Sequence, residues 1–348
     1  MQPRPFGITG YAIPQIVFGC SALGNLYAVV EDPVKLAICR QWFRCVDLRP
    51  IVIDVAGKYG AGMALEQLGR CLEVLEVDPA DVLISNKLGW RRRPLTTPEP
   101  TFEPGVWKGL SHDAEQDVSY QGILDCWNEG RDLLGEAYSP QLVSVHDADE
   151  YLAAASSPDD RKRRLDDVLD AYAALHQLKA QGLVGAVGIG AKDWQVIREL
   201  DRKVAFDWVM LANSLTILRH PPELLAFVGD LTNRGVGIIN SAVFHAGFLV
   251  GGRFFDYKRL SREDADASTL FEWRDQFHRI CSGHGVAPAV ACVQFALAAP
   301  GVAAVALNSS DPARVAENVA ATQQTLPRGF WAELRDRGLI DIEVSQAS

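Results

Sequence analysis

The chain has 348 residues, of which 48% are hydrophobic and 22% are charged. Nearly half of it is therefore available for a core, which excludes a disordered, collagen-like or small disulfide-stabilised protein. Forty-four acidic and 34 basic residues give a formal net charge of −10. Because such a chain repels a polyanion, nucleic acid is not expected as a partner.

The cysteines and the N-terminus limit the location of the protein. The seven cysteines are scattered, and no two are separated by two residues, so we expect reduced thiols and no metal site. The N-terminal segment MQPRPFGITGYAIPQ has no apolar signal core, which favours a cytoplasmic protein. The uncharged stretch 286–307 is long enough to span a membrane. Pro288, Gln294 and the Pro300-Gly301 pair interrupt it, so we expect a buried helix, a turn and a buried strand, and no membrane contact.

Short apolar runs alternate with longer segments of helical periodicity along the chain. Eight runs predict strands, at 15–19, 51–54, 82–87, 141–146, 184–190, 206–211, 236–240 and 302–307. Helical patterns lie between them, for example at 64–75, 165–178 and 313–321. This alternation predicts parallel strands joined by crossover helices, and the nearly continuous apolar runs predict strands covered on both faces. Eight such units favour an α/β protein with a closed (β/α)₈ TIM barrel over an open doubly wound sheet. We expect residues 1–348 to form this barrel as a single domain.

Two long irregular stretches, 90–119 and 251–269, follow the third and the seventh predicted strands. In a barrel such βα loops lie at the C-terminal ends of the strands and build the active site. The first stretch and the residue after it hold Trp90, Phe102, Trp107 and Tyr120, which a surface insertion would expose to solvent. We therefore expect both stretches to be loops at the active-site end.

Four polar residues end predicted strands or follow them closely. Asp54, Lys87 and His146 end the second, third and fourth strands, and Tyr59 lies five residues after Asp54. Each alone has a structural explanation, such as a helix cap or a buried core histidine. Because the C-terminal ends of parallel strands meet at one end of a barrel, we expect all four residues around one pocket.

This group of residues suits proton transfer. A lysine ammonium close to Tyr59 favours the phenolate and lowers the tyrosine pKa, and Asp54 would pair with Lys87 and prevent an isolated buried cation. His146 would hydrogen-bond the reacting oxygen, in a site suited to carbonyl–alcohol interconversion. One alternative is that Lys87 forms a Schiff base in an aldolase.

Most of the chain, from about residue 16 to residue 321, resembles the aldo-keto reductase superfamily. FGCSALGNL resembles its first strand and loop, IDVAGKYGAGMALEQLGRCL its Asp–Tyr segment, VLISNKLG its lysine strand and VSVHD its histidine strand. KAQGLVGAVGIGAKDW and SSDPARVAENVAA match as well. GIGAKDW and KYGAGMALEQLG are most similar to the bacterial branch that contains D-threo-aldose 1-dehydrogenase, also called L-fucose dehydrogenase, and pyridoxal 4-dehydrogenase.

The resemblance implies an NAD(P)-dependent oxidoreductase without a metal, with Tyr59 as general acid/base. The sequence does not settle the oligomeric state, for which we expect a monomer or weak homodimer. We expect it to oxidise an aldose at its anomeric carbon, with a pyridoxal 4-dehydrogenase or a general aldehyde reductase as alternatives. A cofactor-sensing regulatory subunit is the non-enzymatic alternative, against which the four intact residues argue. Tyr27, Trp90 and Trp107 suit stacking on a substrate oriented by His146, whereas the run Arg91–Arg93 reads as a solvated charged face.

The cofactor site implied by the resemblance departs from the family pattern at three points. Gly190 and Ala191 stand where many relatives have a Ser-Asn pair at the nicotinamide carboxamide, and Ser241 stands where an aromatic residue often stacks on the nicotinamide. Asn308 stands where NADP-preferring relatives carry a basic residue, so we expect NAD to be preferred and NADP to remain possible. The expected cofactor residues are Gly19, Cys20, Ser21, Asp54, Gly190, Lys192, Asn213, Ser241, Phe244, Asn308, Ser309, Arg314, Glu317 and Asn318. The last five belong to a strand end and helix N-terminus that suit a phosphate.

Overall fold

The predicted strands form a closed barrel. In the computed structural model, which describes residues 1–256 and 258–344, eight parallel strands close on themselves in the order β3-β4-β5-β8-β9-β10-β11-β14. The expected α/β fold with a (β/α)₈ barrel is confirmed, and the extent of the domain over 1–348 stays a prediction. The barrel strands are β3 Ile16–Gly19, β4 Ile51–Ala56, β5 Val82–Leu88, β8 Leu142–His146, β9 Ala186–Ala191, β10 Trp208–Ala212, β11 Gly237–Ser241 and β14 Val302–Leu307.

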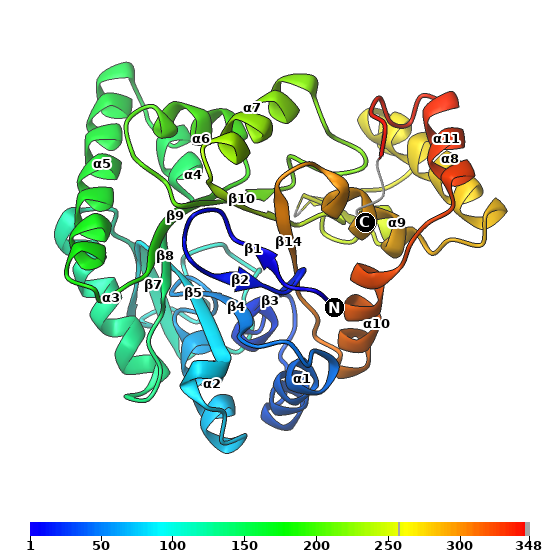
Figure 1. Ribbon diagram of the computed structural model, residues 1–348. Helices are drawn as coiled ribbons and strands as arrows, with labels where there is room; N and C mark the ends of the chain where they lie inside the picture. The colour runs from blue at the N-terminus through cyan, green and yellow to red at the C-terminus, as the bar shows by residue number, and fades with distance from the viewer. Residues whose placement is uncertain (257, 345–348) are drawn as a thin grey trace.

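Helices surround the barrel (Figure 1). The helices predicted at 64–75, 165–178 and 313–321 are found as α2, α5 and α10. The second begins earlier than expected, because Pro158 occupies its first turn and the Ser157 side chain accepts a hydrogen bond from the Asp160 amide. The helices are α1 Asp32–Cys45, α2 Met63–Val74, α3 Tyr120–Leu134, α4 Ala148–Ala153, α5 Pro158–Ala180, α6 Trp194–Asp201, α7 Pro222–Asn233, α8 Ser268–Gly283, α9 Pro288–Ala298, α10 Pro312–Gln323 and α11 Arg328–Asp336.

An N-terminal hairpin covers the N-terminal ends of the strands. Its strands β1 (Arg4–Pro5) and β2 (Ala12–Ile13) are antiparallel and cross the barrel in the view of Figure 1. Phe6 packs there with Trp208 inside the barrel, and a Cβ atom on Gly237 would lie 2.6 Å from the Phe6 ring. The hairpin plugs this end, so the opposite, C-terminal ends of the strands remain for a site.

The two long stretches contain more regular structure than expected. Within 90–119, β6 (Trp90–Pro94) pairs with β7 (His112–Gln116) as an antiparallel hairpin. The stretch 251–269 holds the short strands β12 (Phe254–Phe255) and β13 (Lys258–Arg259). The expectation of irregular loops is therefore corrected, because backbone pairing forms even where the strand sequences lack apolar alternation.

No helix in the described ranges is by itself long and apolar enough to cross a membrane; α8 and α9 satisfy that criterion only as a pair, and a bend of 98° separates them. The stretch 286–307 is a helix (α9), a turn and a buried strand (β14), as expected.

Candidate active site

A cavity of about 930 Å³ opens at the C-terminal ends of the barrel strands. Asp54, Tyr59, Lys87 and His146 all line it, so the fold brings the four predicted residues together. Asp54, Lys87 and His146 come from the adjacent strands β4, β5 and β8. This convergence follows from the parallel pairing, in which the C-terminal ends of neighbouring strands lie side by side.

Tyr59 is held in place by the turn after β4. Its backbone packs directly against the loop after β3, where a Cβ atom on Gly24 would lie 2.7 Å from the carbonyl carbon of Tyr59. The next residue, Gly60, has a φ of +63°, which few other residues adopt. Two glycines therefore allow the close approach that places the phenol beside Lys87.

Lys87 links Tyr59 to Asp54. Its Nζ lies 2.5 Å from Asp54 Oδ2 and 3.1 Å from Tyr59 Oη, while Ser85 donates to Asp54 Oδ1 over 3.1 Å. Burial by itself lowers the pKa of Lys87, but the charge of Asp54, and after it Tyr59, outweighs burial, so that the pKa rises above its usual value. Lys87 is thus a buried cation at neutral pH, and a cation at this distance favours the phenolate form of Tyr59.

His146 is a neutral imidazole in the wall of the cavity. Burial, with smaller contributions from Lys87 and Lys58, lowers the pKa of His146 to about 3 despite the opposing charge of Asp147. Its Nδ1 has no hydrogen-bonding partner among the described residues, and its ring meets that of Tyr59 edge-on at 5.6 Å. A neutral imidazole in the cavity wall can donate or accept a hydrogen bond, so His146 is suited to contact a ligand oxygen.

Of the three aromatic residues predicted to stack on the substrate, two line the cavity and one does not. Tyr27 and Trp107 belong to its wall. Trp90 lies outside the lining, since its ring is covered by Phe102, at 5.9 Å, and by the Lys58 ammonium, at 4.9 Å. The three arginines after it pair with carboxylates on the hairpin, α2 and α3, which agrees with a charged face: Arg91 with Asp125, Arg92 with Glu66, and Arg93 with Glu115.

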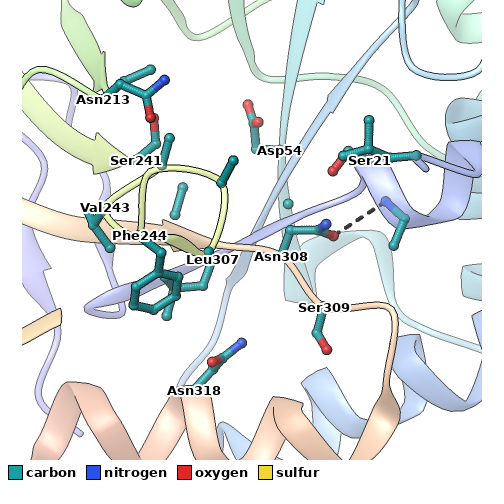
Figure 2. Close-up of a pocket in the computed structure, with 18 of the residues that line it drawn as sticks. Ser21, Asp54, Asn213, Ser241, Val243, Phe244, Leu307, Asn308, Ser309 and Asn318 are labelled. Carbon is teal, nitrogen blue, oxygen red and sulfur yellow. Dashed lines mark hydrogen bonds between the residues drawn. The ribbon is translucent and has the colours of Figure 1, made fainter. Parts of the chain in front are cut away.

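The predicted cofactor residues surround the other part of the same cavity. Figure 2 shows Ser21, Asn308, Ser309 and Asn318 around this part, with the Phe244 ring nearby. Cys20 is the exception, because it is fully buried in the core between two residues that do line the cavity. The predicted residues found in the lining are Gly19, Ser21, Asp54, Gly190, Lys192, Asn213, Ser241, Phe244, Asn308, Ser309, Arg314, Glu317 and Asn318.

The donors and acceptors present fit a nicotinamide dinucleotide. Asn213 is buried in the lining, and its Oδ1 has no hydrogen-bonding partner among the described residues. This oxygen can accept a hydrogen bond from the carboxamide N–H of a nicotinamide. Phe244 offers an aromatic face. Arg314 supplies a cation close to the start of α10, which suits an anionic group.

The sequence analysis missed Lys58, which also lines the cavity. This lysine is only 4% exposed, and its Nζ lies 2.7 Å from both Asp147 Oδ2 and Glu103 Oε1. Its position directly before Tyr59 was the available signal. The two carboxylates lie in other loops, so the ion cluster could not be inferred from the sequence.

Comparisons with known proteins agree with this geometry. Pyridoxal 4-dehydrogenase of Microbacterium luteolum is 28% identical, over 97% of this chain and 98% of its own. D-threo-aldose 1-dehydrogenase of Pseudomonas sp. is also 28% identical, over 95% and 96%. A solved aldo-keto reductase of Bacillus halodurans, in its holo form, has the same fold, with a TM-score of 0.69 at 19% identity over 99% of this chain and 98% of its own.

The aldo/keto reductase family model matches residues 15–337. This match argues against the alternative of an aldolase that uses Lys87. The chain belongs to the aldo/keto reductase family and is an NAD(P)-dependent oxidoreductase that acts on CH–OH groups.

Proposed function

We propose that this enzyme is an aldose 1-dehydrogenase of the L-fucose or D-threo-aldose type, which oxidises a cyclic hemiacetal at its anomeric carbon to a lactone. The observation that carries the proposal is the contact of Lys87 Nζ with Tyr59 Oη at 3.1 Å, inside a cavity that also has an aromatic wall and buried carboxylates. This combination provides a base for a sugar hydroxyl and groups that recognise the rest of the ring.

In this proposal Asp54, Tyr59, Lys87 and His146, which we call the tetrad, each have a separate role. Lys87 stabilises the phenolate form of Tyr59, whose Oη takes the proton of the anomeric hydroxyl and becomes a neutral phenol. Asp54 holds the ammonium in place, while neutral His146 orients the reacting oxygen through a hydrogen bond. The nicotinamide, when bound, supplies the hydride acceptor.

The remaining cavity residues would hold the dinucleotide. Asn213 and Ser241 suit the carboxamide, and Phe244 suits the nicotinamide ring. Near α10 the proposed contacts are Ser309 and Arg314 with a phosphate or adenine, and Glu317 and Asn318 with adenine or ribose. Gly19, Ser21, Gly190, Lys192 and Asn308 complete this part of the wall.

A substrate screen tests the proposal. We expect oxidation of L-fucose, D-arabinose or L-galactose to exceed that of pyridoxal, because the carboxylates of Glu103 and Asp147 can accept hydrogen bonds from the several ring hydroxyls of a sugar and pyridoxal offers fewer such donors. The initial rate of nicotinamide reduction is measured for each compound with both cofactors. Faster turnover of pyridoxal would favour the second candidate, which the 28% identity to a pyridoxal 4-dehydrogenase supports. Activity confined to simple aldehydes with reduced cofactor would contradict the aldose proposal.

We also expect NAD to be preferred over NADP. Asn308 is neutral and accepts a hydrogen bond from the Ala22 amide, so the wild-type enzyme lacks one charge-assisted contact with a 2′-phosphate. Replacing it, Asn308→Arg, should shift the ratio of kcat/KM values toward NADP by roughly 10 to 150-fold, equivalent to about 1.5–3 kcal/mol. An NADP preference of about tenfold or more in the wild-type enzyme would show instead that Arg314 or Lys192 outweighs the missing charge.

A further inference from the structure

Three charged side chains from three segments meet beside the tetrad. Lys58 comes from the turn after β4, Glu103 from the loop between β6 and β7, and Asp147 from the residue after His146. We define these three residues as the Lys58 cluster. Lys58 Nζ lies 2.7 Å from a carboxylate oxygen of each partner, and all three residues line the cavity.

Lys58 and Asp147 are buried, whereas the Glu103 side chain is partly exposed. Burial alone lowers the pKa of Lys58, but Asp147 and then Glu103 outweigh burial and raise it. Burial by itself raises the pKa of Asp147, but the charges of Lys58 and Lys192 outweigh burial and lower that pKa. Burying such charges costs free energy, which the pairing of Lys58 with two carboxylates offsets.

Of the two carboxylates, Glu103 has one partner at each oxygen, Lys58 and Trp107, whereas Asp147 has a partner at one oxygen only within the part of the chain that the structure describes. Lys58 occupies Oδ2 of Asp147 and Oε1 of Glu103. Within the described residues Oδ1 of Asp147 has no hydrogen-bonding partner, although its residue lines the cavity. An ionised carboxylate accepts and does not donate, so this wall selects ligand groups that donate, such as hydroxyls.

Backbone strain places both carboxylates. Glu103 and Asp147 have φ values of +44° and +54°, in the left-handed region that non-glycine residues rarely adopt. Strain of this kind gathers at functional sites, where the surrounding structure enforces it. Here the shared Lys58 ammonium holds both residues.

The same lysine fixes the aromatic wall through Glu103. Glu103 Oε2 accepts a hydrogen bond of 2.6 Å from the Trp107 indole, and the Trp107 ring lies 5.7 Å from that of Tyr59. A flat apolar ring face beside ionised acceptors matches a sugar, which has C–H groups on its ring faces and hydroxyls at its edge.

We propose that Lys58 is a positioning residue that determines specificity: it fixes Glu103 and Asp147 as acceptors for the ring hydroxyls of a neutral polyhydroxylated substrate. This inference rests on the proposed function, since it concerns the substrate of the same site. The inference names Lys58 as the residue through which the site selects a hemiacetal with further ring hydroxyls over one that has only the reacting hydroxyl.

The test compares two hemiacetals that undergo the same oxidation. L-Fucose carries ring hydroxyls, whereas 2-hydroxytetrahydropyran has only the reacting one. In Lys58→Met we expect kcat/KM for L-fucose to fall by roughly 10 to 150-fold, mainly through KM, as for the loss of a charge-assisted contact. The value for 2-hydroxytetrahydropyran should fall by less, because that substrate has no further ring hydroxyl to contact the two carboxylates, so the ratio of the two kcat/KM values is the readout. Lys58→Arg, which keeps the charge, should restore most of the selectivity.

Matched variants separate specificity from structure. Lys35 is also buried but lies outside the cavity lining, so Lys35→Met should leave the ratio of the two kcat/KM values unchanged. If Lys58→Met does not fold, Glu103→Gln takes its place and should lower the same ratio. An equal loss on both hemiacetals, or no loss on either, would overturn the inference. A wild-type enzyme that oxidises neither hemiacetal would overturn the proposed function itself.

Discussion

Tyr59→Phe should lower kcat by at least about 10² to 10⁴-fold, the contribution typical of a general acid/base. The variant loses only the oxygen that lies 3.1 Å from Lys87 Nζ, and the ring that contacts His146 and Trp107 remains. Steady-state kinetics with the best aldose measure the loss, and titration of cofactor fluorescence should show nearly unchanged cofactor affinity.

Tyr138→Phe is the matched control for this substitution. Its hydroxyl donates to the Val77 carbonyl over 2.8 Å and lies outside the cavity lining. That variant should keep the wild-type kcat. The proposed role of Tyr59 is wrong if Tyr59→Phe turns over at a rate near that of the wild-type enzyme.

Lys87→Met should destabilise the protein as well as lower its rate of catalysis. Removing the ammonium leaves Asp54 buried without its cation, and breaking a buried ion pair costs about 3–5 kcal/mol. The pair is short, 2.5 Å, and both side chains are almost completely buried. Urea unfolding measures the decrease in the free energy of unfolding.

A double variant shows whether the stability loss in Lys87→Met comes from an unpaired buried carboxylate or from the lost packing of the lysine side chain. In Asp54→Asn combined with Lys87→Met no carboxylate is left unpaired, so we expect the double variant to be more stable than Lys87→Met alone. The two variants would be equally unstable if packing of the lysine stem were the cause. In that case the electrostatic account of the pair would fail.

The barrel could be predicted because its strands are short apolar runs of the kind that parallel pairing buries on both faces. The hairpin of β6 and β7 could not. Its strands read WRRRP and HDAEQ, without the apolar alternation that marks a half-buried strand. The arginines are satisfied by carboxylates from other elements, a tertiary effect that local sequence does not contain.

The candidate site, like the fold, could be predicted from the sequence only in part. Asp54, Lys87 and His146 could be grouped from the sequence, because strand order alone brings strand ends together. Trp90 and Cys20 were misplaced, since the side on which a side chain lies is decided by local backbone direction and by packing partners. Lys58 was missed because its partners belong to loops whose paths the sequence does not reveal.

The long loop after β5 is anchored before any substrate arrives. The pairing of β6 with β7 and the Glu103–Trp107 hydrogen bond join the loop to itself, and the Arg91–Asp125 ion pair joins it to α3. A binding wall that is ordered in advance spares association the conformational entropy of fixing side chains, about 0.5–1.5 kcal/mol for each one. We therefore expect the loop to contribute to substrate affinity by being preorganised.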